Sequence, residues 1–346
     1  MKKIVLILIF IMLLPLNIKA ETLNNYIVMD MNSKRILKEY NKDEIIYPAS
    51  TTKIMTLIVG IENSNPTDIA KAGNEILTID GTNIYAEIKE NFLLIDLFYG
   101  MMLRSGNDAA MIIAKNTGGT VENFVKLMNQ KTRMLKLKNT RFQNPTGLDD
   151  NTFNKSSVND LALIYSYGYK NKLFRNIVKT KEYKTESDKK SYYFKNRNEL
   201  LNKYNRATGG KTGYTPKAGR LLVSSATNND LNIVIASHGD TYGYKNHISF
   251  YEEVFKKYKN YLIIDKNSFK EKTDLKGKLY IKNSFIYPLT KEEKNNINKK
   301  IVFNKNKKGH VADLIIYIKD KEIHKEKIYL KKDKTNFLKK ISIHNK

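Results

Sequence analysis

Cysteine is absent from this chain of 346 residues, and only five histidines are present. Without a thiol, the sequence excludes cysteine nucleophiles and disulfide bonds, so folding needs no oxidising step in any compartment. No histidine has a carboxylate nearby at a spacing typical of metal ligands. The five are His238, His247, His310, His324 and His344. We therefore expect neither a metal nor another cofactor.

Long hydrophobic runs are also scarce. The run from Ile4 to Leu16 covers 13 residues, whereas a helix needs roughly 20 to span a bilayer. It follows Lys2 and Lys3 and ends shortly before Ala20, the small residue that signal peptidase requires. Residues 1–20 are therefore predicted to be a secretory signal peptide, which places the mature protein outside the cytoplasm, in the periplasm or cell wall.

Acidic residues are outnumbered: 35 Asp and Glu stand against 61 Lys and Arg, which gives a formal net charge of +26. Such an excess would suit nucleic acid, but the basic residues are scattered among acids and form no groove-reading motif. We expect no nucleic-acid partner. The charge favours a solvated basic surface, with attraction to anionic envelope polymers or lipid head groups as the alternative.

Apolar periodicity indicates a first domain over residues 21–262. Short strands open it, helices fill its middle and strands return near Lys211, so one sheet is built from both ends of the segment. The helices of the middle form a subdomain beside that sheet. The predicted strands are Tyr26–Met31, Lys34–Tyr40, Arg220–Ala226 and Leu231–Ser237, and the predicted helices are Phe92–Leu103, Ala109–Ala114, Val121–Leu135 and His247–Tyr261, with one more beginning near Ser50.

Residues 263–333 have the pattern of short strands without long helices and predict a small β-sandwich. Its expected strands are Lys278–Ile281, Lys300–Phe303, Val311–Ile318 and Glu322–Leu330. The basic tail, residues 334–346, includes Phe337, Leu338, Ile341 and Ile343 among lysines. Two interpretations of the tail stay open, a membrane contact and a frayed basic end, because its helical periodicity is incomplete.

Three short motifs carry candidate chemistry: Ser50–Lys53 (S-T-T-K), Ser105–Asn107 (S-G-N) and Lys211–Gly213 (K-T-G). Taken alone, each has a structural interpretation, as a helix cap with a solvated lysine, a loop serine before a cap, or a strand edge with a turn glycine. Their occurrence together, in this order and on elements of the expected kinds, favours a serine acyl-transfer site.

The first motif supplies a nucleophile and a base. Lys53 lies one helical turn after Ser50, so the two side chains share a helix face. A lysine removes a serine proton only when neutral, and lowering its pKa from about 10.4 to about 7 costs on the order of 4 to 5 kcal/mol. Burial on an apolar helix and a second cation, Lys211, both favour the neutral amine.

With these motifs the chain resembles the low-molecular-weight penicillin-binding proteins that are D-alanyl-D-alanine carboxypeptidases, serine peptidase family S11. The resemblance extends to Tyr47–Ala49, Asn144–Leu148 and Asn196–Leu201. It implies an α/β penicillin-binding/β-lactamase-like domain, with an antiparallel sheet, helices on both faces and a helical subdomain. A small all-β sandwich domain follows in the family.

The resemblance also implies a role for each motif residue. Ser50 would attack the carbonyl between two D-alanines, and Lys53 would accept its proton. Ser105, hydrogen-bonded between Lys53 and Lys211, would relay that proton to the departing amine. Asn107 would hold Lys53 and the substrate amide. Water would then release the acyl-enzyme without a metal.

Substrate binding is expected on the third motif. By the resemblance, the backbone N–H groups of Ser50 and Tyr214 would form the oxyanion hole, with Gly213 beside them. Thr212 would bind the terminal carboxylate with support from Arg197. The implied partners are the peptidoglycan stem peptide and β-lactam antibiotics, which acylate the same serine.

One departure concerns the substrate carboxylate. Many relatives place an arginine after a Gly-Gly pair, where this chain has Ser237–Asp240 (S-H-G-D). An inward Asp240 would repel a carboxylate, so we expect it to point to solvent. Arg197, or else Arg220 or Lys217, would then do more of the binding.

Other functions remain open on the sequence alone. A serine β-lactamase would need a deacylating base, and the stretch at Glu199 is one residue short of the class A element. A transpeptidase usually has a larger amino-terminal region, and a metallo-carboxypeptidase lacks its ligands here. A non-enzymatic wall-binding protein on the same fold would be expected to lose Ser50 or Lys53, and both are present.

Overall fold

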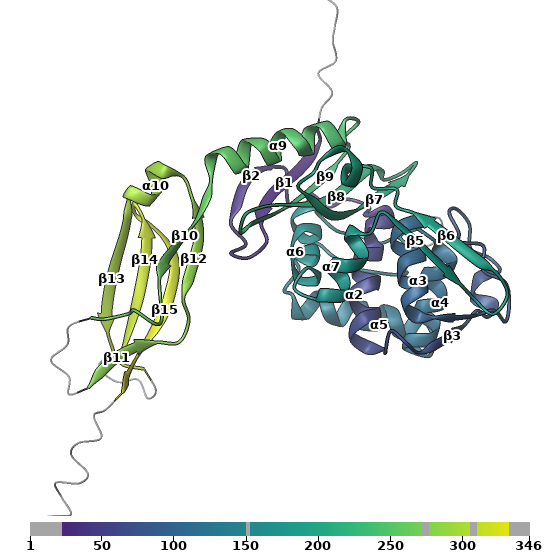
Figure 1. The fold of residues 1–346 in the computed structure, drawn as a ribbon, viewed down its shortest axis with the longest axis horizontal. Helices are drawn as coiled ribbons and strands as arrows, with labels where there is room; N and C mark the ends of the chain where they lie inside the picture. The colour runs from purple at the N-terminus through teal and green to yellow at the C-terminus, as the bar shows by residue number, and fades with distance from the viewer. Residues whose placement is uncertain (1–22, 150–152, 272–276, 305–309, 332–346) are drawn as a thin grey trace, which may run out of the picture.

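The computed structural model describes residues 23–149, 153–271, 277–304 and 310–331. It shows a larger part with a sheet and helices and a smaller part made of strands (Figure 1). The predicted signal peptide and the basic tail lie outside the described residues. Within the described ranges, no helix has both the length and the apolar character needed to cross a membrane.

A five-stranded antiparallel sheet forms the centre of the larger part, in the order β2-β1-β9-β8-β7. The first strand pairs with the late strand β9, with Met29 opposite Val234. This confirms a sheet built from both ends of the segment. The strands are β1 (Asn25–Asp30), β2 (Ile36–Tyr40), β7 (Ala207–Thr215), β8 (Gly219–Asn228) and β9 (Leu231–His238).

Both faces of this sheet are covered, because successive side chains of a strand point to opposite faces. On β9, Ile233 and Ile235 pack into one apolar cluster with Tyr251 of α9, whereas Val234 and Ala236 belong to the larger core on the other face. Helices α8 (Leu200–Lys203) and α9 (Gly243–Lys257) cover the first face, and α6 (Val158–Gly168) and α7 (Lys172–Lys179) lie against the second, with α2 (Lys53–Asn63) packed against both of them.

The helical subdomain lies beside the sheet (Figure 1). The helix expected over Phe92–Leu103 begins later and changes character, since α3 is followed by a π-helical turn that ends just before Ser105. The elements of this region are η1 (Ala49–Thr52), β3 (Ile69–Lys71), η2 (Asn74–Ile76), β4 (Asn91–Leu93), α3 (Leu94–Tyr99), η3 (Gly100–Arg104), α4 (Asn107–Gly118) and α5 (Val121–Met134). A hairpin, β5 (Glu182–Glu186) with β6 (Ser191–Lys195), joins it to the sheet.

The smaller part is a sandwich of two sheets, as expected. Apolar side chains of both sheets share one core, including Ile263 and Leu289 from one and Leu314, Ile316 and Ile328 from the other. The two-stranded sheet is β10 (Lys259–Ile264) with β12 (Phe285–Leu289). The other sheet has the order β11 (Lys278–Ile281), β15 (Lys321–Lys331), β14 (Ala312–Ile318), β13 (Ile297–Phe303), and α10 (Lys291–Asn295) connects the two.

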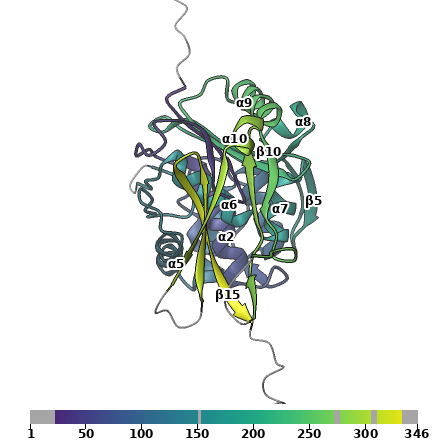
Figure 2. The same cartoon turned by 90° about the vertical axis from the view of Figure 1, so that its left-hand side faces the viewer.

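Strand pairing moves the boundary between the two parts. The helix expected over His247–Tyr261 is α9, which ends at Lys257, and β10 starts two residues later. Because β10 pairs with β12 of the sandwich, residues 259–262 belong to the smaller part. Seen end-on, the sandwich lies in front of the larger part (Figure 2).

Arg35, in the turn between β1 and β2, connects the two parts. Its guanidinium lies over the rings of Tyr258 and Tyr287, 5.2 and 5.1 Å from their centroids. It also donates hydrogen bonds to the Pro288 carbonyl and to the carboxylate of Glu293. A desolvated cation–π contact contributes up to about 2 kcal/mol, so Arg35 helps to hold the sandwich against the larger part, together with the hydrogen bond from Asn260 Nδ2 to the Asp230 carbonyl at 2.9 Å.

Replacing Arg35→Ala should therefore loosen the joint while leaving each part folded. Small-angle X-ray scattering is expected to show a broader distance distribution and a larger maximum dimension than the wild type. The matched control is Lys38→Ala, because Lys38 pairs with Glu253 inside the larger part. Superimposable scattering curves for Arg35→Ala and the wild type would contradict this role.

Candidate active site

Ser50 lies in the 3₁₀ turn η1, which leads into α2, so its backbone is at a helix N-terminus as predicted. The turn is held from behind by the loop containing Gly147. That glycine has φ +88°, and a Cβ on it would lie 1.8 Å from the Ala49 carbonyl oxygen. Only glycine fits this close approach. The half-buried Ser50 side chain lines the main cavity.

Lys53 is fully buried, and its amine is surrounded by oxygen atoms. Its Nζ lies 3.0 Å from Ser50 Oγ, 2.7 Å from Asn107 Oδ1 and 2.6 Å from the Thr146 carbonyl oxygen. A neutral amine has two N–H donors, which satisfy Asn107 and Thr146. Its lone pair then faces the hydroxyl of Ser50, so the geometry suits proton removal from the serine.

The electrostatic surroundings favour that neutral form. Burial lowers the pKa of Lys53 well below its usual value, and the positive charge of Lys211 lowers it further. Arg197 acts in the same direction, whereas Asp108 opposes the shift in the pKa of Lys53. Desolvation and like charge disfavour an ammonium ion, as the sequence predicted.

Lys211 and Ser105 form a second pair beside the first. Lys211 Nζ donates to Ser105 Oγ at 3.0 Å and to the Thr212 carbonyl at 2.9 Å. Burial, followed by the charge of Arg197, lowers the pKa of Lys211 to about 7. Ser105 follows the π-helical turn with φ +70°, in the left-handed region.

Ser105 was expected to hydrogen-bond to both Lys53 and Lys211, and only the bond to Lys211 is present. Lys211 binds it, but the hydrogen bonds of Lys53 go to Ser50, Asn107 and Thr146 instead. Within the described residues, no hydrogen bond joins Lys53 to Ser105. The physical reason is that the Thr146 carbonyl occupies a donor position of the Lys53 amine.

Asn107 is fixed at the N-terminus of α4. Its backbone N–H donates to the Thr82 carbonyl and its Nδ2 to the Asp80 carbonyl, both at 2.7 Å. These bonds fix which way the side-chain amide points, so its oxygen is presented to Lys53. The loop between η2 and β4 thus positions a residue of the site.

Strand β7 brings the third motif to this cluster. It is the edge strand of the sheet, and it passes close to η1: a Cβ on Gly213 would lie 3.2 Å from the backbone N of Thr51. The side chains of Thr212 and Tyr214 share one face of β7 and line the cavity. The edge of β7 that does not pair with β8 faces Ser50, where the two backbones come close together.

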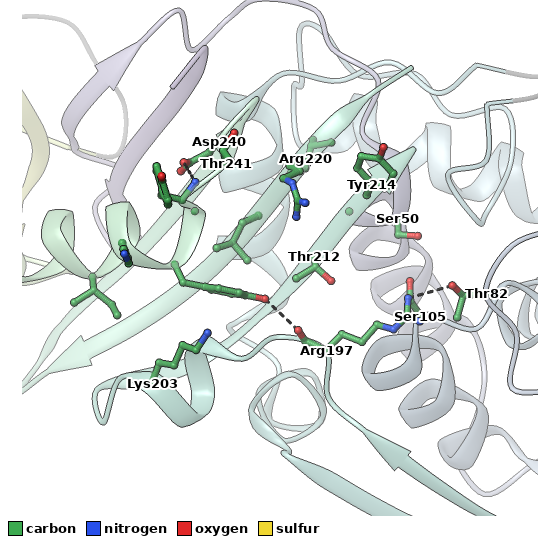
Figure 3. Close-up of a pocket in the computed structure, with 18 residues that line it drawn as sticks. Ser50, Thr82, Ser105, Arg197, Lys203, Thr212, Tyr214, Arg220, Asp240 and Thr241 are labelled. Carbon is green, nitrogen blue, oxygen red and sulfur yellow. Dashed lines mark hydrogen bonds between the residues drawn. The ribbon is translucent and has the colours of Figure 1, made fainter. Parts of the chain in front are cut away.

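The cavity, of about 560 Å³, extends from Ser50 and Ser105 along β7 and β8 to the start of α9 (Figure 3). Arg197 reaches across it from the opposite wall. Its guanidinium donates to Thr82 Oγ1 at 3.1 Å, and its carbonyl accepts from the Tyr244 hydroxyl at 3.1 Å. Six of the nine residues singled out in the sequence line this cavity, which are Ser50, Ser105, Arg197, Thr212, Gly213 and Tyr214. The other three, Lys53, Asn107 and Lys211, are buried behind it and are hydrogen-bonded to Ser50, to Lys53 and to Ser105, respectively.

Thr146 is a site residue to which the sequence assigned no role. Its carbonyl accepts from Lys53, and its own backbone N–H is held by the side-chain oxygen of Asn144. The only sequence signal for Thr146 is that it lies in Asn144–Leu148, one of the stretches in which the chain resembles the family. A backbone carbonyl carries no side-chain signature, so its contact with Lys53 is visible only in the structure.

Asp240 does not point to solvent, and that expectation is wrong. It is 6% exposed and lies at the cavity wall. Its Oδ1 accepts from the Tyr242 backbone N–H at 3.1 Å and from Asn246 Nδ2 at 2.8 Å, which directs it toward the start of α9. Lys217 is also engaged elsewhere, since its Nζ donates to the Asp149 carbonyl at 3.0 Å.

Comparisons with known proteins agree with this geometry. A family model described as D-alanyl-D-alanine carboxypeptidase matches residues 15–240. D-alanyl-D-alanine carboxypeptidase DacA of Haemophilus influenzae is 36% identical over 235 residues, which cover 64% of this chain and 57% of the relative. DacF of Bacillus subtilis, a carboxypeptidase of the same description, is 30% identical over 226 residues, covering 64% and 58%. The matches span little more than half of these curated relatives.

Solved structures extend the similarity to both parts of the chain. Penicillin binding protein 5 from Haemophilus influenzae superposes with a TM-score of 0.77 and 26% identity, covering 90% of this chain and 97% of that one. The D-alanyl-D-alanine carboxypeptidase DacD from Francisella tularensis has the same fold, with a TM-score of 0.74 and 24% identity over 93% and 95%.

The lowered pKa of Lys211 predicts a pH-dependent stability. With a pKa of about 7 when folded and 10.5 in its unperturbed state, Lys211 binds more protons in the unfolded chain between these pH values. Its contribution to the free energy of unfolding therefore rises with pH from 7 to 10.5 and is lost as pH falls through that window. One proton corresponds to about 1.4 kcal/mol per pH unit.

Urea unfolding at pH 7.5, 8.5 and 9.5 measures this slope. The wild type should gain up to about 1.4 kcal/mol per pH unit more than Lys211→Met. Lys217→Met, which removes an exposed lysine of the same hairpin, should keep the wild-type slope. Equal slopes for wild type and Lys211→Met would show that Lys211 is charged in the folded protein across this range.

Proposed function

Because the chain belongs to the D-alanyl-D-alanine carboxypeptidase family of serine peptidases, we propose that it removes the terminal D-alanine from peptidoglycan stem peptides through an acyl-enzyme on Ser50. The observation that carries this proposal is the buried amine of Lys53, 3.0 Å from the Ser50 hydroxyl. A second buried lysine, Lys211, donates to Ser105, which lines the same cavity as Ser50.

Acylation begins with Ser50. Its Oγ attacks the carbonyl carbon between the two D-alanines while Lys53 takes the hydroxyl proton. The negative charge that develops on the carbonyl oxygen is stabilised by the backbone N–H groups of Ser50 and Tyr214. The approach of β7 to η1 at Gly213 supports this assignment, since it brings the two backbones together.

The departing amine needs a proton when the C–N bond breaks. Ser105 donates its hydroxyl proton to that amine and takes one from Lys211, 3.0 Å away. The pKa of about 7 lets Lys211 give and regain a proton near neutral pH. Lys53 gives the proton that it took from Ser50 to water in the open cavity, and Lys211 regains one proton from that water, so both lysines return to their starting states before water hydrolyses the ester.

The substrate peptide binds along the edge of β7. An extended peptide can add to an exposed sheet edge through backbone hydrogen bonds, and β7 is such an edge. Asn107 holds the substrate amide beside Lys53. Thr212, which lines the cavity on β7, is the residue at which we expect the terminal carboxylate to bind.

A β-lactamase activity is less well supported by the site. Glu199 is exposed and forms an ion pair with Lys203, one helical turn later. It is therefore engaged at the surface and does not serve as a base for water at Ser50. We accordingly expect a β-lactam to acylate Ser50 and remain attached.

We propose an extracytoplasmic location, in the periplasm or cell wall. The support is the charged start, apolar run and small residue of the predicted signal peptide in residues 1–20. The apolar and basic residues of 334–346 support a peripheral contact with the membrane surface. Both segments lie outside the described residues.

Mass spectrometry of the mature protein incubated with penicillin tests the nucleophile. A covalent adduct of the full drug mass is expected on Ser50, and none on Ser50→Ala. Lys53→Arg keeps the positive charge but should lose acylation by about 100-fold or more, because guanidinium does not act as a base near neutral pH. Ser33→Ala, at a turn outside the cavity, is the matched control.

A wild type without an adduct would contradict acylation by Ser50. Rapid loss of the adduct with turnover of the drug would instead assign a β-lactamase. Release of free D-alanine from a pentapeptide ending in D-Ala-D-Ala identifies the carboxypeptidase, whereas transfer to an added amine without release to water identifies a transpeptidase.

A further inference from the structure

Arg220, on the strand next to the third motif, places a second arginine at the cavity. It lies opposite Tyr214 in the β7–β8 ladder, and Thr212 lies opposite Leu222. Directly paired residues of an antiparallel ladder point to the same face. Arg220 therefore shares the cavity face with Thr212 and is its diagonal neighbour across the ladder, roughly 7 to 8 Å away.

Figure 3 shows this arrangement directly. The Arg220 side chain extends from β8 into the cavity, beside Tyr214 and toward Thr212, with Arg197 on the opposite side. An arginine side chain is long enough to cover the diagonal distance to Thr212. A ligand group beside the Thr212 hydroxyl would thus lie within reach of the Arg220 guanidinium.

Arg220 is a cation whose donors are not used by the protein. Among the described residues, its side chain has no hydrogen bond and no ion pair. Two neighbouring cations differ in this respect, since Arg197 donates to Thr82 and Lys203 pairs with Glu199, while Lys245 lies over the Tyr242 ring. A guanidinium offers five N–H donors in a planar fork that matches a carboxylate.

Asp240, the acidic residue that lines the cavity near Arg220, does not occupy the N–H donors of the Arg220 guanidinium. Its carboxylate is directed to the start of α9 by Tyr242 and Asn246. It nevertheless places negative charge at the cavity, which would weaken binding of an anion. The positive charge of Arg220, on the cavity face of β8, offsets the negative charge of Asp240 at the place where a bound anion would lie.

The order of the catalytic groups identifies the anion. Ser50 marks the scissile bond, and Thr212 is the residue at which the terminal carboxylate of the substrate is expected. Arg220 extends from the neighbouring strand toward Thr212, on the part of the cavity that leads to α9 (Figure 3). The leaving residue of the substrate therefore carries its terminal carboxylate toward Arg220.

We propose that Arg220 is the specificity-determining residue that binds the carboxylate of the leaving D-amino acid, together with Thr212. This inference rests on the proposed carboxypeptidase function. It makes the free terminal carboxylate the group that the enzyme recognises on the leaving side. Arg197, which is held by Thr82, instead acts on the charge of the two lysines.

The test compares two substrates that differ only in this carboxylate: a pentapeptide ending in D-Ala-D-Ala and the same peptide with a terminal carboxamide. The wild type is expected to prefer the free carboxylate by about 10- to 100-fold in kcat/KM, as a charge-assisted bidentate contact implies. In Arg220→Gln this preference should fall to within about 3-fold, mainly through a higher KM for the free acid.

Two further variants sharpen the result. Arg220→Lys should keep part of the preference, since it retains the charge but not the planar fork. Lys217→Gln removes one positive charge from the same hairpin, where Lys217 binds the Asp149 carbonyl, and should keep the full preference. Thermal unfolding followed by circular dichroism verifies that each variant is folded.

An unchanged preference in a folded Arg220→Gln would overturn the assignment of Arg220. Loss of the preference in Lys217→Gln as well would also overturn it, because a general effect of charge would then explain the data. Failure of the wild type to hydrolyse either peptide would instead contradict the proposed function itself, so the two failures are distinguishable.

Discussion

Burial of the Lys53 amine beside a second buried lysine is the constraint on which the site depends. An ammonium ion in that position would lack water and would face the charge of Lys211. The folded protein therefore favours a neutral amine at the one place where a base is needed. The cost falls on stability, since an unfolded chain would leave both lysines charged in water.

The surrounding fold keeps the Lys53 amine buried and hydrogen-bonded. Three segments distant in sequence meet at the amine: α2 contributes Lys53 itself, the N-terminus of α4 contributes Asn107, and the loop after Pro145 contributes the Thr146 carbonyl. Gly147 and Gly213 allow the closest backbone approaches around η1, one behind it and one in front. The same contacts that exclude water from Lys53 also place Ser50 at the edge of β7.

The catalytic side chains were predictable because their motifs are local: one helical turn separates Ser50 from Lys53, and the strand of Lys211 has its own apolar pattern. The hydrogen bond from Lys53 to Thr146 joins residues 93 positions apart, and no periodicity reports it. Asp240 was misplaced for a similar reason, since its direction is set by Tyr242 and Asn246 at the start of α9.

Parts of the fold also lacked a readable pattern. Helix α6 is buried on most sides and so has no contrast between a polar and an apolar face, although Ser157 caps it. Helix α7 does have an apolar face, formed by Phe174, Ile177 and Val178, but its eight residues are too few for that face to stand out in the sequence. The polar hairpin β5–β6 is held by contacts of its tip, such as Asp188 with Asn91. These elements depend on tertiary contacts more than on local sequence.

The ionisation state of Lys53 in the free enzyme tests the account most directly. Carbon-13 labelling of lysine at Cε, with the Lys53 resonance assigned from a Lys53→Arg sample, allows its titration to be followed by NMR. The account predicts a Lys53 pKa well below 10.5, so that the neutral amine is present near neutral pH. A titration midpoint near 10.5 would contradict it, because Ser50 would then have no base.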